Sequence, residues 1–132
     1  MDMDFATIAA IIVSAVLYGL ADWFFGGILF HDKYLAYPEV WRPRESNVYA
    51  IVAAQALGLL SAIAFVVMSV KLGQTDFSQA LTLAFYIWLL APVPIYLTNF
   101  AFMKLHWMIV ASHLAGWFVK LMAMALVTAA FL

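Results

Sequence analysis

Cysteine is absent from this chain of 132 residues, and charged residues make up only 10% of it. The absence of cysteine excludes disulfides, thiolate metal sites and thiol catalysis. Soluble domains carry roughly 25% charged residues, whereas 68% of this chain is hydrophobic. The formal net charge of −1 also excludes the basic field that attracts a protein to nucleic acid. The composition therefore predicts a protein whose main partner is the lipid bilayer.

Four apolar runs are long enough to cross a membrane, because about 30 Å of hydrocarbon needs about 20 apolar residues. The first run lacks the basic flank and the cleavage site of a signal peptide, so we expect it to be retained as a helix. The sequence predicts an all-α membrane protein, with one domain over residues 1–132. This domain is expected to be a bundle of four transmembrane helices in two antiparallel hairpins. The expected helices cover about residues 5–30, 49–70, 77–103 and 107–131.

The connections between these helices differ in length. Residues 71–76 and 104–106 are short turns, which predict that the helices they join are antiparallel neighbours. The long connection, residues 31–48, contains aromatic residues that alternate with charges. Such residues favour the membrane–water interface, so we expect an interfacial loop. It either lies in the headgroup zone or is an ordinary loop with aromatic anchors, which are Tyr34, Tyr37 and Trp41.

Basic residues are unevenly divided between the two ends of the expected bundle. The end that holds the first and third loops carries four of them, and the opposite end carries Lys71. Because cytoplasmic loops carry the excess of Lys and Arg, we expect loop 31–48 in the cytoplasm. The N- and C-termini then face outside. The four basic residues are Lys33, Arg42, Arg44 and Lys104.

Each expected helix carries a polar residue that the bilayer disfavours. At about 1.5 Å rise per residue, these residues lie about 8–12 Å from the same end of the bundle. They are Asp22, Gln55, Asn99 and His113. Lys120 lies deeper, but helical side chains lean toward the helix N-terminus, which brings its ammonium toward this layer. Tyr18 shares a face with Asp22, and Trp117 shares one with Lys120, so the seven residues form a candidate intramembrane polar site.

Asp22 is expected to face the bundle interior and to meet the fourth helix through His113 or Lys120. An isolated carboxylate in lipid would be neutralised or would find a cation. Two interpretations of such a pair stay open. It could only fasten helices together, as buried polar residues in membrane bundles do. It could also form a ligand or proton site, since ionisable groups inside membranes are functional by default.

Small residues form a stripe along the second expected helix. They recur every four positions, so they share one face and allow another backbone to approach closely. The stripe predicts a helix contact, either within the chain or with a second copy. Its members are Ala50, Ala54, Gly58 and Ala62.

The residue pattern predicts no metal site and no cofactor. The methionines of the fourth helix do not share one face, so we interpret them as gap fillers and not as copper ligands. Haem between two histidines would need a second histidine on an opposing helix, which the pattern does not provide. A single axial ligand at His106 or His113 stays open.

Two parts of the chain resemble a known family. Residues 90–100 (Leu-Ala-Pro through Asn-Phe), together with the later Ser112-His113-Leu114, are similar to the C-terminal half of domain-of-unknown-function family 1761. The end of the first helix is also similar, with Asp22-Trp23-Phe24-Phe25-Gly26 before an aromatic segment that ends at Trp41. The resemblance implies a small four-helix membrane protein of the bacterial inner membrane and implies no activity.

Two functions compete for this chain. A small transport or channel-like protein would use the polar site for a small solute, ion or proton. It would be a homo-oligomer, because four helices enclose too little volume for a pathway. The alternative is an accessory subunit of a larger membrane complex, in which the polar residues only fasten helices. An enzyme is not expected, because neither a nucleophile with its base nor an intramembrane carboxylate pair is evident.

Overall fold

A computed structural model of the protein describes residues 3–43 and 45–132. Four of its helices are long and apolar enough to cross a membrane, which confirms the expected all-helical fold and makes this a multi-pass membrane protein. Arg44, one of the four basic residues used to predict orientation, lies outside the described residues. The candidate spans are Phe5–Leu29, Val48–Lys71, Phe77–Phe102 and Trp107–Phe131.

The first span changes its helical type partway along. Helix α1 covers Phe5–Asp22 and continues directly into a π-helix, η1, over Trp23–Leu29. Asp4 begins α1 as its N-cap, where its carboxylate accepts a hydrogen bond from the backbone N–H of Thr7 at 2.9 Å. The sequence predicted the extent of this helix closely, but it did not predict the change of type after Asp22.

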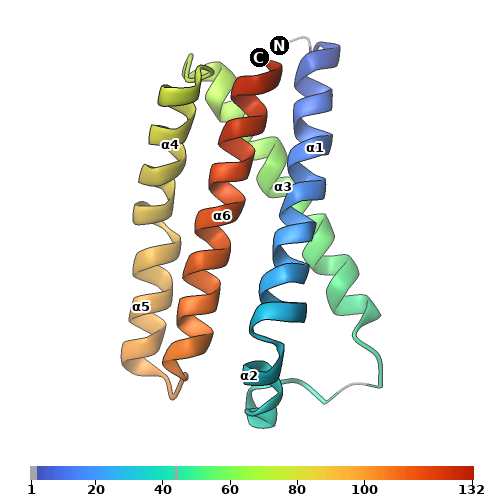
Figure 1. Ribbon diagram of the computed structural model, residues 1–132, viewed down its shortest axis with the longest axis vertical. Helices are drawn as coiled ribbons and strands as arrows, with labels where there is room; N and C mark the ends of the chain where they lie inside the picture. Colours follow the sequence, from blue (N-terminus) through green and yellow to red (C-terminus); the bar gives the residue numbers. More distant parts are fainter. Residues whose placement is uncertain (1–2, 44) are drawn as a thin grey trace.

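A short helical segment follows the first span and lies at one end of the bundle. It contains helix α2 over His31–Leu35 and a 3-10 turn, η2, over Pro38–Val40. Figure 1 shows α2 at the same end as the turn between α5 and α6, whereas α1 begins and α6 ends at the opposite end. The expected interfacial loop is therefore partly helical.

The third span is two helices, which corrects the expectation of one continuous helix. Helix α3 covers Val48–Lys71, and after a turn α4 covers Phe77–Leu90 and α5 covers Pro92–Phe102. The break falls at Ala91, whose φ of −121° and ψ of −70° are not helical. Proline has no backbone N–H and its ring crowds the preceding turn, so Pro92 begins a new helix instead of continuing α4.

Helix α6, over Trp107–Phe131, is the centre of the bundle. It packs against α1, α4 and α5 and more lightly against α3, while α3 packs mainly on α1. Figure 1 shows α6 between α1 and the α4–α5 pair, with α3 crossing at a slant. The short turn between α3 and α4 does not make them packed neighbours, contrary to the expectation, because α3 leans toward α1 and away from α4.

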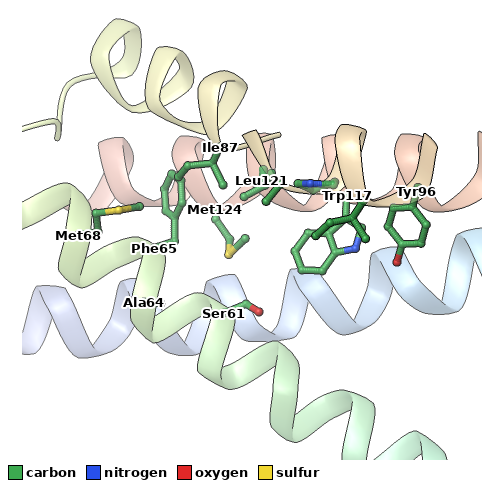
Figure 2. A pocket seen from close by; sticks show the side chains of 12 residues that line it. Ser61, Ala64, Phe65, Met68, Ile87, Tyr96, Trp117, Leu121 and Met124 are labelled. Atoms are coloured by element: carbon green, nitrogen blue, oxygen red, sulfur yellow. The ribbon is translucent and has the colours of Figure 1, made fainter. Parts of the chain in front are cut away.

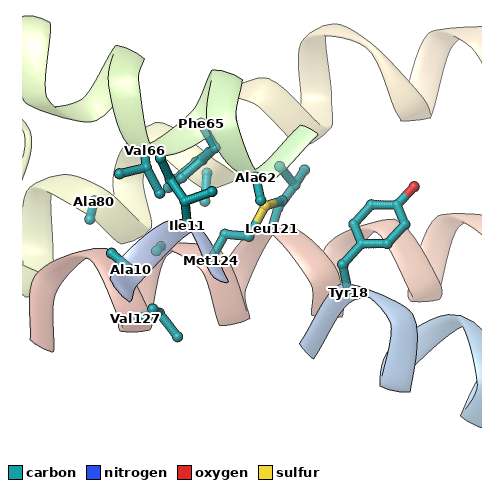
Figure 3. Packing of buried hydrophobic residues seen from close by; sticks show 12 residues of the cluster. Ala10, Ile11, Tyr18, Ala62, Phe65, Val66, Ala80, Leu121, Met124 and Val127 are labelled. Carbon is teal, nitrogen blue, oxygen red and sulfur yellow. The ribbon is translucent and has the colours of Figure 1, made fainter. Parts of the chain in front are cut away.

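Small side chains allow the helices to approach closely in the core. Alanines from four helices are fully buried around Phe65 and Met124 (Figure 3). In the predicted stripe, Gly58 and Ala62 are buried, whereas Ala50 is exposed. A Cβ at Gly58 would lie 2.5 Å from the Cδ1 atom of Tyr18 on α1. The helix contact is therefore confirmed for the half of the stripe nearest the core, and its partner is α1.

Candidate functional site

An ion pair joins α1 to α6 inside the candidate spans. The Lys120 Nζ atom donates a hydrogen bond to Oδ1 of Asp22 at 2.7 Å. The Lys120 side chain is only 7% exposed, and the Asp22 side chain is 35% exposed. The predicted contact between Asp22 and the fourth helix is confirmed, with Lys120 as the partner.

Two aromatic rings cover the Lys120 ammonium. Its Nζ atom lies 4.2 Å from the ring centre of Tyr18 and 4.3 Å from that of Trp117. The two rings meet edge to face with their centres 5.7 Å apart. Aromatic faces attract cations, and the attraction grows when water is excluded. The structure thus brings together four of the predicted site residues, and their close contacts hold the charge of Lys120 away from lipid.

His113 lies in a neighbouring aromatic cluster. Its ring stacks on Tyr96 with centres 4.8 Å apart and an interplanar angle of 5°, and it is tilted against Tyr34 at 6.2 Å. No hydrogen bond joins His113 to Asp22 or Lys120 within residues 3–43 and 45–132. His113 and Lys120 are seven residues apart on α6 and so lie on the same face of it, which makes His113 a neighbour of the pair and not a member of it.

Tyr34 fastens the interfacial segment to α6. Its hydroxyl lies 2.9 Å from the Ser112 hydroxyl, and its backbone carbonyl accepts a hydrogen bond from Trp41 Nε1 at 2.7 Å. Burial raises the pKa of the Tyr34 hydroxyl above its ordinary value of 10.0, although the Ser112 hydrogen bond opposes this effect. The sequence identified Tyr34 as an interface anchor but did not predict its contact with the helix that carries His113.

Gln55 and Asn99 do not join the ion pair. The Gln55 side chain crosses the α1 backbone at Gly19, where a Cβ would collide with its Oε1 atom. Asn99 lies half-buried on α5. In the described part of the chain, no side-chain hydrogen bond connects either residue to Asp22 or Lys120. The expected polar layer is therefore divided into separate contacts.

Sequence reasoning missed Tyr96, which supports the imidazole of His113. A usable signal was present, because Tyr96 precedes Asn99 by three positions and so shares its face of α5. His106, by contrast, has a structural role. Its Nδ1 atom accepts a hydrogen bond from the Met108 backbone at 3.2 Å and so caps α6, while its ring stacks on Tyr37. A haem ligand at His106 would have to give up this cap.

The chemistry open to the pair depends on the Asp22 carboxylate oxygen that Lys120 does not contact. Lys120 occupies one carboxylate oxygen, and no hydrogen bond to the second one occurs among the residues that the structure describes. An ionised carboxylate accepts through both of its oxygens. Since about a third of the side chain is exposed (35%), the second oxygen can receive a cation or a hydrogen-bond donor. No group of three potential metal ligands was found among the described residues.

Comparison with known proteins identifies the family. The model of the family described as "Protein of unknown function (DUF1761)" matches residues 5–129, which is nearly the whole chain and includes most or all of each candidate span. No match was found among the curated proteins or among the solved structures. The expected resemblance is confirmed, and the chain belongs to the DUF1761 family.

Proposed function

We propose that this protein binds a small cation or a proton inside the membrane and passes it across, with the Asp22–Lys120 pair as its site. One observation carries the proposal. Lys120 holds a single Asp22 oxygen at 2.7 Å, and the rest of a carboxylate that is 35% exposed stays available. A cation or proton donor that reaches this oxygen competes with Lys120 for the negative charge.

The geometry fits a site better than a simple fastener. Apolar residues fasten helices without the desolvation cost of a buried ion pair. The pair is also enclosed on one side only, because Tyr18 and Trp117 cover Lys120 while Asp22 stays accessible. The π-helix that begins right after Asp22 adds support, since π segments occur frequently at functional sites.

A flux measurement tests the proposal. Vesicles loaded with a pH-sensitive dye receive the purified protein, and a potassium gradient with valinomycin drives protons inward. Wild-type protein is expected to acidify the vesicles faster than protein-free vesicles do, and Asp22→Asn is expected to abolish the difference. Asp76→Asn is the matched control, because Asp76 is an exposed cap outside the core and asparagine also caps helices.

A parallel series measures sodium uptake instead of proton uptake, with a sodium-sensitive dye in the vesicles. Protein-free rates in both series, or an unaltered Asp22→Asn rate, would overturn the proposal.

We further propose that the working form is a homo-oligomer. The core of one bundle is filled by buried side chains such as Ala10, Ala62 and Met124, so a continuous path needs an interface between copies. Mass measurement in detergent is expected to give a protein mass of at least twice 14.7 kDa, in whole multiples of it. A monomer under conditions that preserve flux contradicts this part of the proposal.

An accessory subunit is the second candidate, and the tight enclosure of Lys120 favours it. A lysine held by Asp22 and two aromatic rings is also what a pure fastener would require. This candidate predicts a monomer that transports nothing alone and co-purifies with other membrane subunits. In either case we propose a non-enzymatic role.

We propose the bacterial inner membrane as the location, with loop 31–48 in the cytoplasm and both termini outside. Lys33 on α2 and Lys104 in the α5–α6 turn support this orientation, because both lie at the end of the bundle opposite to the start of α1 (Figure 1). Lys71 ends α3 at the other end. The excess of basic residues marks the cytoplasmic side.

A further inference from the structure

A second feature of the membrane region is an apolar pocket of about 400 Å³ between α3, the α4–α5 break and α6 (Figure 2). It forms where α3 leans away from α4 and where Pro92 interrupts the third span. Most of its lining is hydrocarbon, including Phe65, Ile87 and Leu121. The helices that line it all belong to candidate spans, so its surroundings are lipid.

Two polar groups at one end of this pocket lack partners. Trp117 and Tyr96 both line the pocket and lie at the same end of it in Figure 2. Trp117 contacts Lys120 through its ring, and Tyr96 contacts His113 through its ring. Within the described residues, neither the Trp117 indole N–H nor the Tyr96 hydroxyl makes a hydrogen bond. Ser61, the hydroxyl across the pocket, already donates to the Leu57 carbonyl at 3.0 Å.

Neither the Trp117 indole N–H nor the Tyr96 hydroxyl is completely buried. Among the described residues, the hydroxyl of Ser14 is the side-chain atom that is both completely buried and without a partner. The Trp117 N–H and the Tyr96 hydroxyl are therefore not completely buried. Lipid hydrocarbon offers them no acceptor, and an unsatisfied polar group in the bilayer core is costly. Buried tryptophan and tyrosine usually find a hydrogen-bond partner, so a pocket ligand is the natural source of one.

We propose that this pocket binds a lipophilic molecule that carries a carbonyl oxygen and enters sideways from the bilayer. Its apolar body would lie against Phe65, Ile87 and Leu121, and its carbonyl would accept from Trp117 and Tyr96. Pockets for small molecules share this pattern of apolar walls with a few polar groups that fix orientation. The inference does not rest on the proposed ion site, because the pocket shares Trp117 with that site but neither Asp22 nor Lys120.

Nuclear magnetic resonance of the tryptophan indole N–H groups tests this directly. The protein is labelled with ¹⁵N-tryptophan in micelles of dodecyl maltoside, a detergent without a carbonyl group. The Trp117 signal is assigned by its loss in Trp117→Phe. Methyl decanoate and decylubiquinone represent acyl-ester and quinone carbonyls, and decane is the probe without an acceptor. At least one carbonyl probe is expected to move the Trp117 proton downfield in a saturable manner, whereas decane does not. Whichever carbonyl probe saturates identifies the type of carbonyl.

Three variants tie the signal to the pocket. Ala64→Phe fills the pocket from α3 and is expected to raise the half-saturating probe concentration at least about tenfold. Ala56→Phe is the matched control on an exposed position of α3 that does not line the pocket, and it is expected to leave binding unchanged. Tyr96→Phe keeps the stacked ring but removes one donor, and it is expected to weaken the preference for the carbonyl over decane.

Four results would overturn the inference. The first is no saturable shift of Trp117 with either carbonyl probe. The second is an equal shift with decane, which would mean that the pocket holds only hydrocarbon. The third is binding that Ala64→Phe leaves intact, which would place the ligand elsewhere. The fourth is loss of the shift at a high protein-to-detergent ratio, which would mean that a dimer displaces the probe. The pocket would then belong to an interface with a second copy.

Discussion

At the residue scale, Lys120 shows how a charge is retained inside an apolar bundle. Its long side chain leans toward the N-terminal end of α6 and reaches Asp22 at 2.7 Å. Tyr18 and Trp117 supply π faces where lipid would otherwise lie. Gly58 then makes room for the Tyr18 ring, because any Cβ at this position would collide with it. One glycine on α3 thus positions an aromatic group of α1 over a cation of α6.

A double-mutant cycle measures the coupling between the paired charges. Asp22→Asn and Lys120→Met are each expected to lower the free energy of unfolding by about 3 kcal/mol, the low end for breaking a buried pair. The low end applies because the Asp22 side chain is 35% exposed. The double variant is expected to lose less than the sum of the single losses, since no charge is left without its partner. Reversible unfolding in mixed detergent micelles provides the measurement, and additive losses would contradict the coupling.

Gly58→Leu tests the position of Tyr18. The new side chain would meet the Tyr18 ring, whose Cδ1 atom lies 2.5 Å from an ideal Cβ, so α1 and α3 must separate. We expect a loss of about 1–3 kcal/mol in the free energy of unfolding, the usual cost of overpacking. Ala56→Leu is the matched control on an exposed position of α3. Equal thermal stability of the two variants in detergent would argue against a close α1–α3 contact.

At the element scale, hydropathy predicted where the four spans lie but not the points within a span where the helix breaks or changes type. Pro92 stood in the third apolar run, yet proline is also tolerated within membrane helices when neighbours satisfy the freed carbonyls. The break at Ala91 therefore depends on packing that sequence does not state. The π-helix after Asp22 could not be predicted either, because it has the same apolar composition as an α-helix and differs only in the hydrogen-bond register.

The interfacial segment gives a prediction about pH. Burial raises the Tyr34 pKa above 10.0, so the folded state holds this proton more tightly than the unfolded state does. The resulting stability is fully present below about pH 10 and is lost as pH rises through the folded pKa. We expect Tyr34→Phe to cost about 0.5–1.5 kcal/mol at pH 7 through loss of the Ser112 hydrogen bond.

The Tyr34→Phe variant should also lose less stability than wild type between pH 9 and pH 11, because it cannot ionise at this position. Unfolding in mixed micelles across this range, on both proteins, checks the expectation. Tyr37→Phe is the comparison variant, since its ring stacks on His106 but its hydroxyl makes no hydrogen bond within the described residues. Parallel pH curves for wild type and Tyr34→Phe would contradict the buried hydroxyl.

At the scale of the whole molecule, the depth of the polar residues along the bundle was predictable from the sequence, but the rotation of each helix about its axis was not. Counting residues at about 1.5 Å each gave the depth of Asp22, and the lean of the Lys120 side chain toward its helix N-terminus brought the ammonium toward the same layer. The structure pairs the two groups. The same count placed Gln55 and Asn99 in that layer, but it says nothing about which way a helix faces. Within the described residues, neither Gln55 nor Asn99 hydrogen-bonds to the pair, and Gln55 lies instead against the α1 backbone at Gly19. The sequence did not predict the slant of α3 either, because a short turn keeps α3 and α4 close only at the end where it joins them.

The orientation of the whole bundle can be tested because the chain contains no cysteine. Glu45→Cys places one thiol in the long loop, and Gln74→Cys places one in the turn between α3 and α4. The excess of Lys and Arg on the loop side predicts that this side is cytoplasmic. In intact bacterial cells, a maleimide that cannot cross the inner membrane is expected to label Gln74→Cys only. Glu45→Cys should react after the cells are opened, which shows that its thiol is accessible. The reverse pattern would place the loop outside, and labelling of both variants in intact cells would mean that the chain inserts in two orientations.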